Sequence, residues 1–181
     1  MAELILITGG ARSGKSSYAL EVSEKKSHSR IFIATCPSID QEMSDRVTRH
    51  REERQGRGWQ TIEEEIELAA LFPEKVQDAG VVLIDCVTLW VNNILYNYGE
   101  EKVDDFVIKN LCLKWLLAME NFPGTVICVT NEVGLGVVPE NRLARKYRDL
   151  VGTCNQLIGR KADEVVLVSC GVPLKIKKKR S

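Results

Sequence analysis

Hydrophobic positions fall in short, nearly continuous runs that alternate with longer stretches of helical spacing. The runs are LILIT (4–8), RIFIAT (30–35), VVLID (81–85), TVICVT (125–130) and EVVLVS (164–169). Runs of this length, rich in β-branched residues, are typical of strands buried on both faces. WQTIEEE (59–65) is a candidate for a further short strand.

The stretches between these runs predict helices, because their apolar residues recur every three or four positions. The predicted helices cover residues 15–26, 39–53, 87–98, 103–122 and 139–162. We expect Pro139 to open the last helix, since proline fits the first helical position, and Leu143, Tyr147, Leu150 and Cys154 follow at helical spacing. Alternating strands and helices predict an α/β fold with a mainly parallel sheet and helices on both faces. At 181 residues we expect one domain, residues 1–181.

Composition excludes several classes of partner. Lys plus Arg and Asp plus Glu are equal at 25 each, so no overall field favours nucleic acid or an anionic membrane. No stretch approaches the roughly 20 apolar residues that span a bilayer. The basic end, KIKKKRS, is expected to be a frayed, solvated tail. The 6 cysteines contain no CxxC pair, which favours a reducing compartment and a cytoplasmic protein.

The first apolar run leads into GGARSGKS at residues 9–16, which matches G-x-x-x-x-G-K-[ST] in full. Glycines let backbone N–H groups surround phosphate oxygens, the lysine reaches the β- and γ-phosphates, and the final hydroxyl binds Mg²⁺. The alternative, a glycine-rich turn that binds nothing, does not explain the strand before and the helix after. The sequence thus predicts a P-loop NTPase-type, RecA-like fold that binds ATP or GTP. The predicted nucleotide-binding residues here are Gly9, Gly10, Ala11, Arg12, Ser13, Gly14, Lys15 and Ser16.

Acidic residues follow two other predicted strands. Asp85 ends VVLID, where a P-loop protein places the carboxylate that holds Mg²⁺ directly or through water. A carboxylate that only caps a loop is the alternative. Asn131 and Glu132 follow TVICVT and are expected at the same edge of the sheet. Ser16 and Asp85 are therefore the predicted Mg²⁺ ligands, and the side chain of Arg12 stays open between a phosphate contact and an exposed position.

His50 lies in the charged segment RVTRHREERQGRGW. Ile39, Met43 and Val47 recur every four residues, and at 100° per residue His50 falls between the last two, on the side facing the body of the protein. Arg46 and Arg54 flank it at i−4 and i+4, an arrangement that suits an anionic ligand. Spacing alone leaves a functional histidine and a satisfied core histidine open. His28, in EKKSHSR, is expected in an ordinary polar turn.

The chain resembles the bifunctional adenosylcobinamide kinase/adenosylcobinamide-phosphate guanylyltransferases of cobalamin biosynthesis. The resemblance covers essentially the whole chain, in order: GGARSGKS, IATC, EMSDRVTRHREERQGRGWQTIEE, LIDCVTLWVNNIL and VTNEVGLGVVPENRLARKYRDLVGTCNQ. It implies phosphorylation of the hydroxyl on the aminopropanol arm of adenosylcobinamide, followed by GMP transfer from GTP to give adenosylcobinamide-GDP. The second step would pass through a guanylylated histidine at His50, with Lys15 as the other catalytic residue.

The same resemblance implies a set of residues near the guanine nucleotide and a homotrimeric assembly. Those residues are Ala34, Thr35, Cys36, Arg51, Glu52, Glu53, Arg54, Glu63 and Asp85. Two other classes of function fit the phosphate-binding loop alone. A plain small-molecule kinase leaves His50 and its arginines unexplained. A nucleotide-dependent switch or nucleic-acid motor is disfavoured by the balanced charge and by the missing guanine-reading N-K-x-D run.

Overall fold

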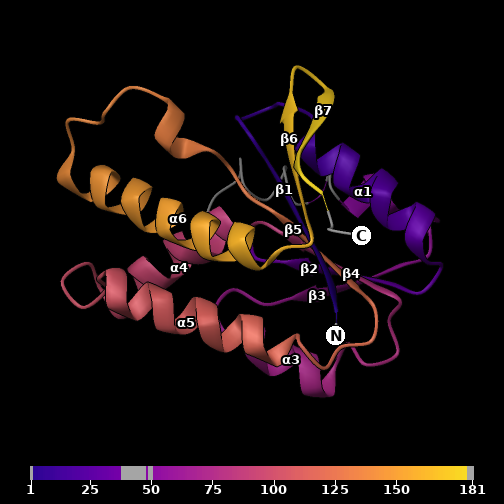
Figure 1. Cartoon of the computed structure of the whole chain (residues 1–181). Coiled ribbons are helices and arrows are strands. Elements are labelled where there is room, and N and C mark those ends of the chain that lie inside the picture. Colours follow the sequence, from indigo (N-terminus) through magenta and orange to yellow (C-terminus); the bar gives the residue numbers. More distant parts are fainter. Residues whose placement is uncertain (1, 38–47, 49–50, 179–181) are drawn as a thin grey trace.

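The computed structural model describes residues 2–37, 48 and 51–178 of the chain. A twisted, 7-stranded sheet runs through the centre, with strand order β3-β2-β4-β5-β1-β6-β7 (Figure 1). The strands are β1 (Glu3–Gly9), β2 (Arg30–Ala34), β3 (Trp59–Glu63), β4 (Val81–Asp85), β5 (Thr125–Val129), β6 (Glu164–Ser169) and β7 (Val172–Lys177). All neighbouring pairs are parallel except β6 with β7. The mainly parallel sheet predicted from the apolar runs is confirmed, and WQTIEEE does supply β3.

Helices cover both faces of the sheet, unequally (Figure 1). They are α1 (Lys15–Lys26), α3 (Leu68–Glu74), α4 (Val87–Tyr98), α5 (Asp105–Ala118) and α6 (Arg142–Lys161), with a short 3-10 helix η1 (Val133–Leu135). Alternate strand residues such as Ile5 and Ile7 pack with Ala19 and Leu20 of α1. Their neighbours in the strands pack on the other face with α3 to α6, around the buried Trp90 and Trp115. Burial on both faces explains why the strand sequences are continuously apolar.

The bounds of two predicted helices were wrong, and one helix was not predicted. α6 begins at Arg142, because the Asn141 side chain accepts a hydrogen bond from Ala144 N at 3.0 Å and acts as the N-cap. Pro139 therefore precedes the helix and does not open it. α5 is shorter than the predicted 103–122, and its N-cap is Asp104. α3 was missed because it is short and contains Pro73. Of the predicted helix at 39–53, only 48 and 51–53 lie within the described residues, and these are helical.

The prediction of a frayed basic tail was wrong for Lys175, Ile176 and Lys177. They belong to β7, which extends the sheet antiparallel to β6. Lys175 Nζ pairs with Glu164 at 2.8 Å, and Lys177 Nζ donates to the carbonyls of Gly159 and Arg160 at the end of α6. A cation at a helix C-terminus is favourable, so both charges have partners inside the fold. Residues 179–181 of the tail lie outside the described residues.

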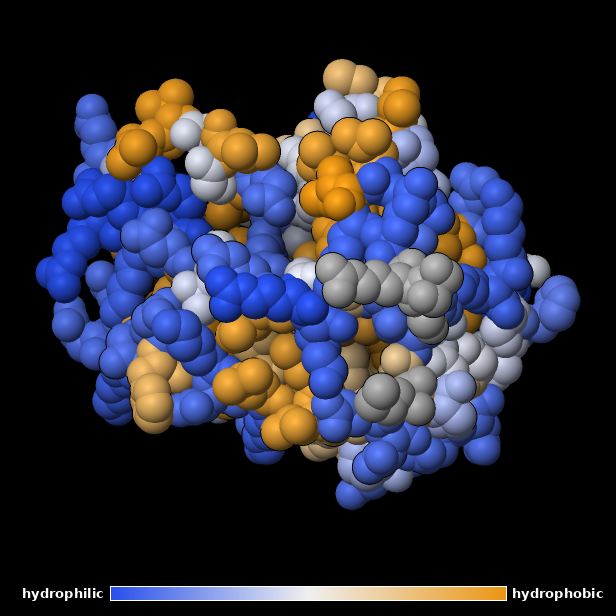
Figure 2. Space-filling view, in the orientation of Figure 1, coloured by the Kyte–Doolittle hydropathy of each residue, from blue (hydrophilic) through white to orange (hydrophobic). Residues whose placement is uncertain are grey.

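Exposed apolar side chains occur in several places on the surface, including α4 and α5. Two groups of them lie over the β6–β7 hairpin and over the loop that precedes α6 (Figure 2). The exposed residues of these two groups are Leu135, Val137, Val138, Val172, Leu174 and Ile176. Within the described residues, no helix is long and apolar enough to cross a membrane.

Candidate active site

The phosphate loop, residues 9–16, joins β1 to α1 and depends on glycine at two positions. A Cβ on Gly9 would lie 2.3 Å from the carbonyl oxygen of Val168, so no side chain fits there. Gly14 has a φ of +92°, which glycine adopts at no steric cost, and it immediately precedes the first residue of α1. The unpaired N–H groups of the first turn of α1 are thus next to the loop, and such groups bind anions.

Lys15 folds back over this loop. Its Nζ donates a 2.8 Å hydrogen bond to Gly10 O, and the residue is only 8% exposed. Ser13 Oγ is buried and has no hydrogen-bond partner among the described residues. Ser16 is half-buried in the first turn of α1, and Gly10, Ala11 and Arg12 are exposed. The structure therefore brings the predicted loop residues together, with the Arg12 side chain on the outside.

The end of β4 lies beside the end of β2. Asp85 is paired in register with Ala34, and its carboxylate is half-buried, with no hydrogen-bond donor among the described residues. Thr35, which is fully buried, accepts a 2.7 Å hydrogen bond from Cys86 N and donates one of 2.8 Å to Cys86 O. Since the hydroxyl of Thr35 is used inside the fold, this part of the site offers mainly backbone to a ligand, together with the half-buried Cys36.

The segment after β5 places a carboxylate next to the phosphate loop. Glu132 N donates to Gly9 O at 3.2 Å, and Glu132 Oε1 accepts a 2.6 Å hydrogen bond from Thr8 Oγ1. Asn155 of α6 donates a longer one of 3.4 Å to the same oxygen. Asn131 turns the other way and donates to Thr88 Oγ1 at 3.0 Å. The two residues predicted at this edge therefore face different neighbours, and only Glu132 lies against the loop.

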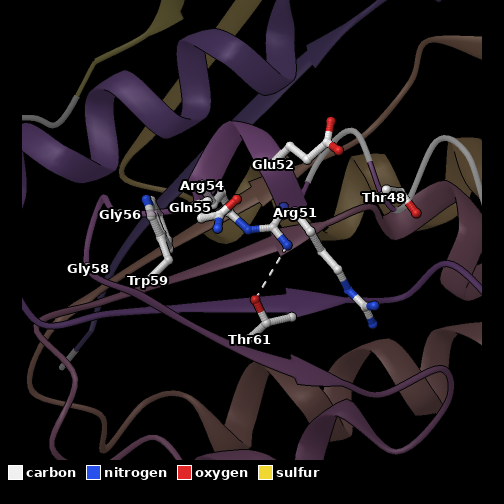
Figure 3. Close-up of a pocket in the computed structure, with 9 residues that line it drawn as sticks. All are labelled: Thr48, Arg51, Glu52, Arg54, Gln55, Gly56, Gly58, Trp59 and Thr61. Carbon is white, nitrogen blue, oxygen red and sulfur yellow. Dashed lines mark hydrogen bonds between the residues drawn. The ribbon is translucent and has the colours of Figure 1, made fainter.

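A second concave region, which we call the arginine pocket, lies over β2 and β3 and has a volume of about 430 Å³ (Figure 3). It is lined by Thr48, Arg51, Glu52, Arg54, Gln55, Gly56, Gly58, Trp59 and Thr61. Of the predicted nucleotide-binding residues, it contains Arg51, Glu52 and Arg54, while Glu53 is exposed next to it. The phosphate loop is not part of it.

Arg54 is the most unusual side chain of the arginine pocket. It is 5% exposed, and its guanidinium carbon lies 3.5 Å from the centre of the Phe32 ring. Its Nη2 makes one long hydrogen bond of 3.4 Å to Thr61, whereas Nε and Nη1 have no partner among the described residues. Burial lowers the pKa of Arg54, and the charge of Asp85 acts in the opposite direction. A buried cation with unused donors is costly unless an anion completes it.

The rest of the arginine pocket is held by ion pairs and by α1. Arg51 forms an ion pair with Glu63, and both side chains are largely exposed. Trp59 Nε1 donates to Glu24 of α1 at 3.1 Å, and Arg57 donates to the same carboxylate at 2.6 Å. Burial opposes ionisation of Glu24, but these two hydrogen bonds outweigh it, and the pKa of Glu24 is lowered.

Some predicted residues lie outside this description, and some lining residues were not predicted. His50 and Arg46, with the stripe formed by Ile39, Met43 and Val47, fall outside the described residues. His28 lies in the bend between α1 and β2, as expected. Sequence reasoning missed the lining residues Thr48, Gln55, Gly56, Gly58, Trp59 and Thr61. The GRGW run could have indicated these residues, because its two glycines have positive φ and turn the chain into β3.

The fold and the loop define a P-loop nucleotide-binding protein of the RecA-like type. Two solved structures share the fold at low sequence identity. The RadB recombinase has a TM-score of 0.51 at 13% identity, over 91% of this chain and 73% of that one. An ATPase from the type III secretion system of pathogenic bacteria has a TM-score of 0.54 at 14% identity, over 96% of this chain and 56% of that one.

Sequence relatives identify the family. The pattern of the family described as cobinamide kinase / cobinamide phosphate guanyltransferase matches residues 5–176. The bifunctional adenosylcobalamin biosynthesis protein CobU of Escherichia coli (strain K12) is 41% identical over 96% of this chain and 99% of its own length. The protein of the same name from Salmonella typhimurium (strain LT2) is 38% identical over the same shares. CobP of Pseudomonas aeruginosa is 36% identical over 95% and 96%. The chain belongs to this family and is a bifunctional kinase and guanylyltransferase.

Proposed function

We propose that this chain phosphorylates adenosylcobinamide with ATP or GTP and then transfers GMP from GTP to the product through a guanylylated His50. The single observation that carries the histidine step is the buried guanidinium of Arg54, whose Nε and Nη1 lack partners among the described residues. It lies four residues after His50, in a pocket large enough for part of a nucleotide. Family membership supports the two reactions themselves.

In the kinase step, the phosphate loop holds the triphosphate. Backbone N–H groups of residues 9–16 and the ammonium of Lys15 stabilise the negative charge that moves from the γ-phosphoryl group to the leaving diphosphate. The carboxylate of Asp85 and the hydroxyl of Ser16 are hard oxygen ligands, and both are half-buried at this edge of the sheet. They fit a bound Mg²⁺, which would neutralise charge on the β- and γ-phosphates.

In the guanylyl step, an imidazole nitrogen of His50 attacks the α-phosphorus of GTP. A nitrogen–phosphorus bond forms, the bond to the bridging oxygen breaks, and pyrophosphate leaves. A phosphate oxygen of adenosylcobinamide phosphate then attacks the same phosphorus, which releases the imidazole and yields adenosylcobinamide-GDP. Arg54 stabilises the charge on this phosphate. We place Ala34, Thr35, Cys36, Arg51, Glu52, Glu53, Glu63 and Asp85 around the same nucleotide.

The test is covalent labelling with GTP that carries its label on the α-phosphorus. We expect wild-type protein to take up an acid-labile, base-stable label, the behaviour of a phosphoramidate, on the peptide that contains His50. His50→Ala should eliminate the label and the guanylyl transfer and leave most of the kinase activity, because phosphoryl transfer needs no covalent histidine. His28→Ala, the matched control, should retain both. Absence of the label from wild type, or its persistence on correctly folded His50→Ala protein, contradicts the proposal.

We also propose that residues 1–181 act as one nucleotide-binding domain in a cytoplasmic homotrimer. Support for assembly comes from the exposed apolar side chains on the β6–β7 hairpin and on the loop before α6. Val137 is 93% exposed and Leu135 is 81% exposed, and contacts between subunits would remove such surface from water. Support for a reducing compartment comes from the free cysteines 86, 112, 128 and 154, which are buried core residues.

A further inference from the structure

We propose that Glu132 is the general base of the kinase step and accepts the proton of the substrate hydroxyl. The proposal rests on the kinase half of the proposed function. Phosphorylation of an alcohol requires that its oxygen attack the γ-phosphorus, that the bond from this phosphorus to the β-bridging oxygen break, and that the hydroxyl proton leave. The phosphate loop and Mg²⁺ ligands account for the phosphoryl group but supply no acceptor for this proton.

Strand order places Glu132 between the two groups that hold the triphosphate. β5 lies between β4, which carries Asp85, and β1, which carries the phosphate loop. The chain after β5 stays against β1: Thr130 N donates to Ile7 O at 2.9 Å and Glu132 N to Gly9 O at 3.2 Å. The Glu132 backbone is therefore tied directly to the first residue of the loop. A hydroxyl that reaches the γ-phosphate on this side of the loop would lie near the Glu132 carboxylate.

The carboxylate of Glu132 is held by one oxygen. Oε1 accepts from Thr8 Oγ1 at 2.6 Å and from Asn155 Nδ2 at 3.4 Å. Asn155 is itself fixed by Thr130 Oγ1, at 2.7 Å, and by Asn131 O, at 3.1 Å. No donor among the described residues contacts Oε2, and the side chain is half-buried. Fixing one oxygen and leaving the other accessible is the arrangement that a positioned base needs.

Neighbouring groups are less suitable as the base. Asp85 lies one strand farther from the loop and is the candidate for the metal, which would suppress its basicity. Asn131 cannot accept a proton, and its amide is engaged with Thr88. The competing role is a structural one, in which Glu132 only anchors Thr8 and Asn155. An amide oxygen would accept the hydrogen bonds from Thr8 and Asn155 as well as the carboxylate does, but an amide cannot act as a base. Replacing Glu132 by glutamine therefore separates the structural role from the catalytic one.

The decisive variant is Glu132→Gln. We expect the turnover of phosphoryl transfer to adenosylcobinamide to fall by about 10²–10³-fold, while ATP affinity and labelling by α-labelled GTP stay unchanged. The acidic limb of the kinase pH profile should also disappear, because that limb reports protonation of the base. Glu101→Gln, an exposed glutamate in the turn before α5, is the matched control and should behave as wild type.

Each other outcome is informative. Unchanged kinase turnover in Glu132→Gln, with an intact acidic limb, overturns the inference. Equal loss of phosphoryl transfer and of α-label also overturns it, since it assigns Glu132 to the structure of the loop. If wild-type protein itself transfers no phosphoryl group to adenosylcobinamide, the proposed function fails, and this result is distinct from either outcome with the variant.

Discussion

The phosphate loop begins at the last residue of β1, whereas the arginine pocket lies over β2 and β3, and the two regions are built from different groups. The loop consists of backbone turned by glycine, with a single cation, Lys15, folded onto it. The arginine pocket consists of side chains from a helical turn and from β3, with Arg54 buried at its base. Backbone donors recognise any triphosphate, whereas a pocket of side chains can select one nucleotide and one phosphorus. This contrast matches a protein with one general and one specialised phosphate chemistry.

Distance sharpens the contrast. β5, β4 and β2 separate β1 from β3, so the strands that carry the two regions are about 19 Å apart at roughly 4.8 Å per strand. One extended nucleoside triphosphate can bridge such a gap, and two separate nucleotides can also occupy it. Whether one cradle serves both reactions is therefore the question that mutations in each region can answer.

The largest effect is expected from Lys15→Ala. If one triphosphate cradle serves both steps, loss of its ammonium should lower phosphoryl transfer and guanylylation alike, by about 10²–10³-fold. Parallel assays with γ-labelled ATP and α-labelled GTP measure the two. Lys25→Ala is the matched control on the same helix, because Lys25 is exposed and its ion-pair partner among the described residues is Glu21, at 2.5 Å. Guanylylation at the wild-type rate in Lys15→Ala would mean that the two regions hold separate nucleotides.

A smaller and selective effect is expected from Arg54→Met. Losing a charged hydrogen-bond donor to phosphate should reduce guanylylation by about 10–100-fold, which corresponds to roughly 1.5–3 kcal/mol, and leave the kinase step largely intact. Because the variant also removes a buried, incompletely paired charge, thermal stability should be unchanged or higher. Arg160→Lys on α6 serves as the control for handling a surface arginine. A marked loss of melting temperature with normal guanylylation would assign Arg54 a structural role.

The difference between the regions also determined what the sequence could predict. Five strands and the phosphate loop each consist of contiguous residues, so the local sequence pattern was sufficient to predict them. β7 was missed because its lysines obscured the alternation of Val172, Leu174 and Ile176. The pairing of β7 with β6, and the contact of Lys177 with the end of α6, can be seen only in the folded structure.

The candidate site divides in the same way. The position of Glu132 at the sheet edge was predicted from its place directly after TVICVT, but its contact with Thr8 joins residues 124 apart in sequence, which no local pattern reveals. The inward position of Arg54 is compatible with helical spacing. The opposite wall of the arginine pocket is formed by Trp59 and Thr61 of β3, whose side chains alternate every second residue. Helical spacing therefore could not reveal these two residues.

Glu24 connects the two regions and carries the smallest expected effect. α1 starts at the phosphate loop, and near its far end Glu24 binds Trp59 and Arg57 at the wall of the arginine pocket. The Glu24 side chain is 24% exposed, so water screens its ion pair with Arg57 only partly.

Glu24→Gln should lower the free energy of unfolding by about 1 kcal/mol near neutral pH, because an amide accepts these hydrogen bonds without the help of charge. The pKa of Glu24 is lowered in the folded protein. Its stabilising contribution is therefore complete above the unfolded-state pKa of about 4.3 and is lost as pH falls through the folded-state pKa. Urea unfolding of wild type and variant should thus show a difference near pH 7 that shrinks below about pH 4. Glu21→Gln, which removes only an exposed ion pair on the same helix, should cost less than about 0.5 kcal/mol at either pH. A difference between wild type and Glu24→Gln that does not vary with pH would show that the charge of Glu24 does not hold the pocket wall to α1.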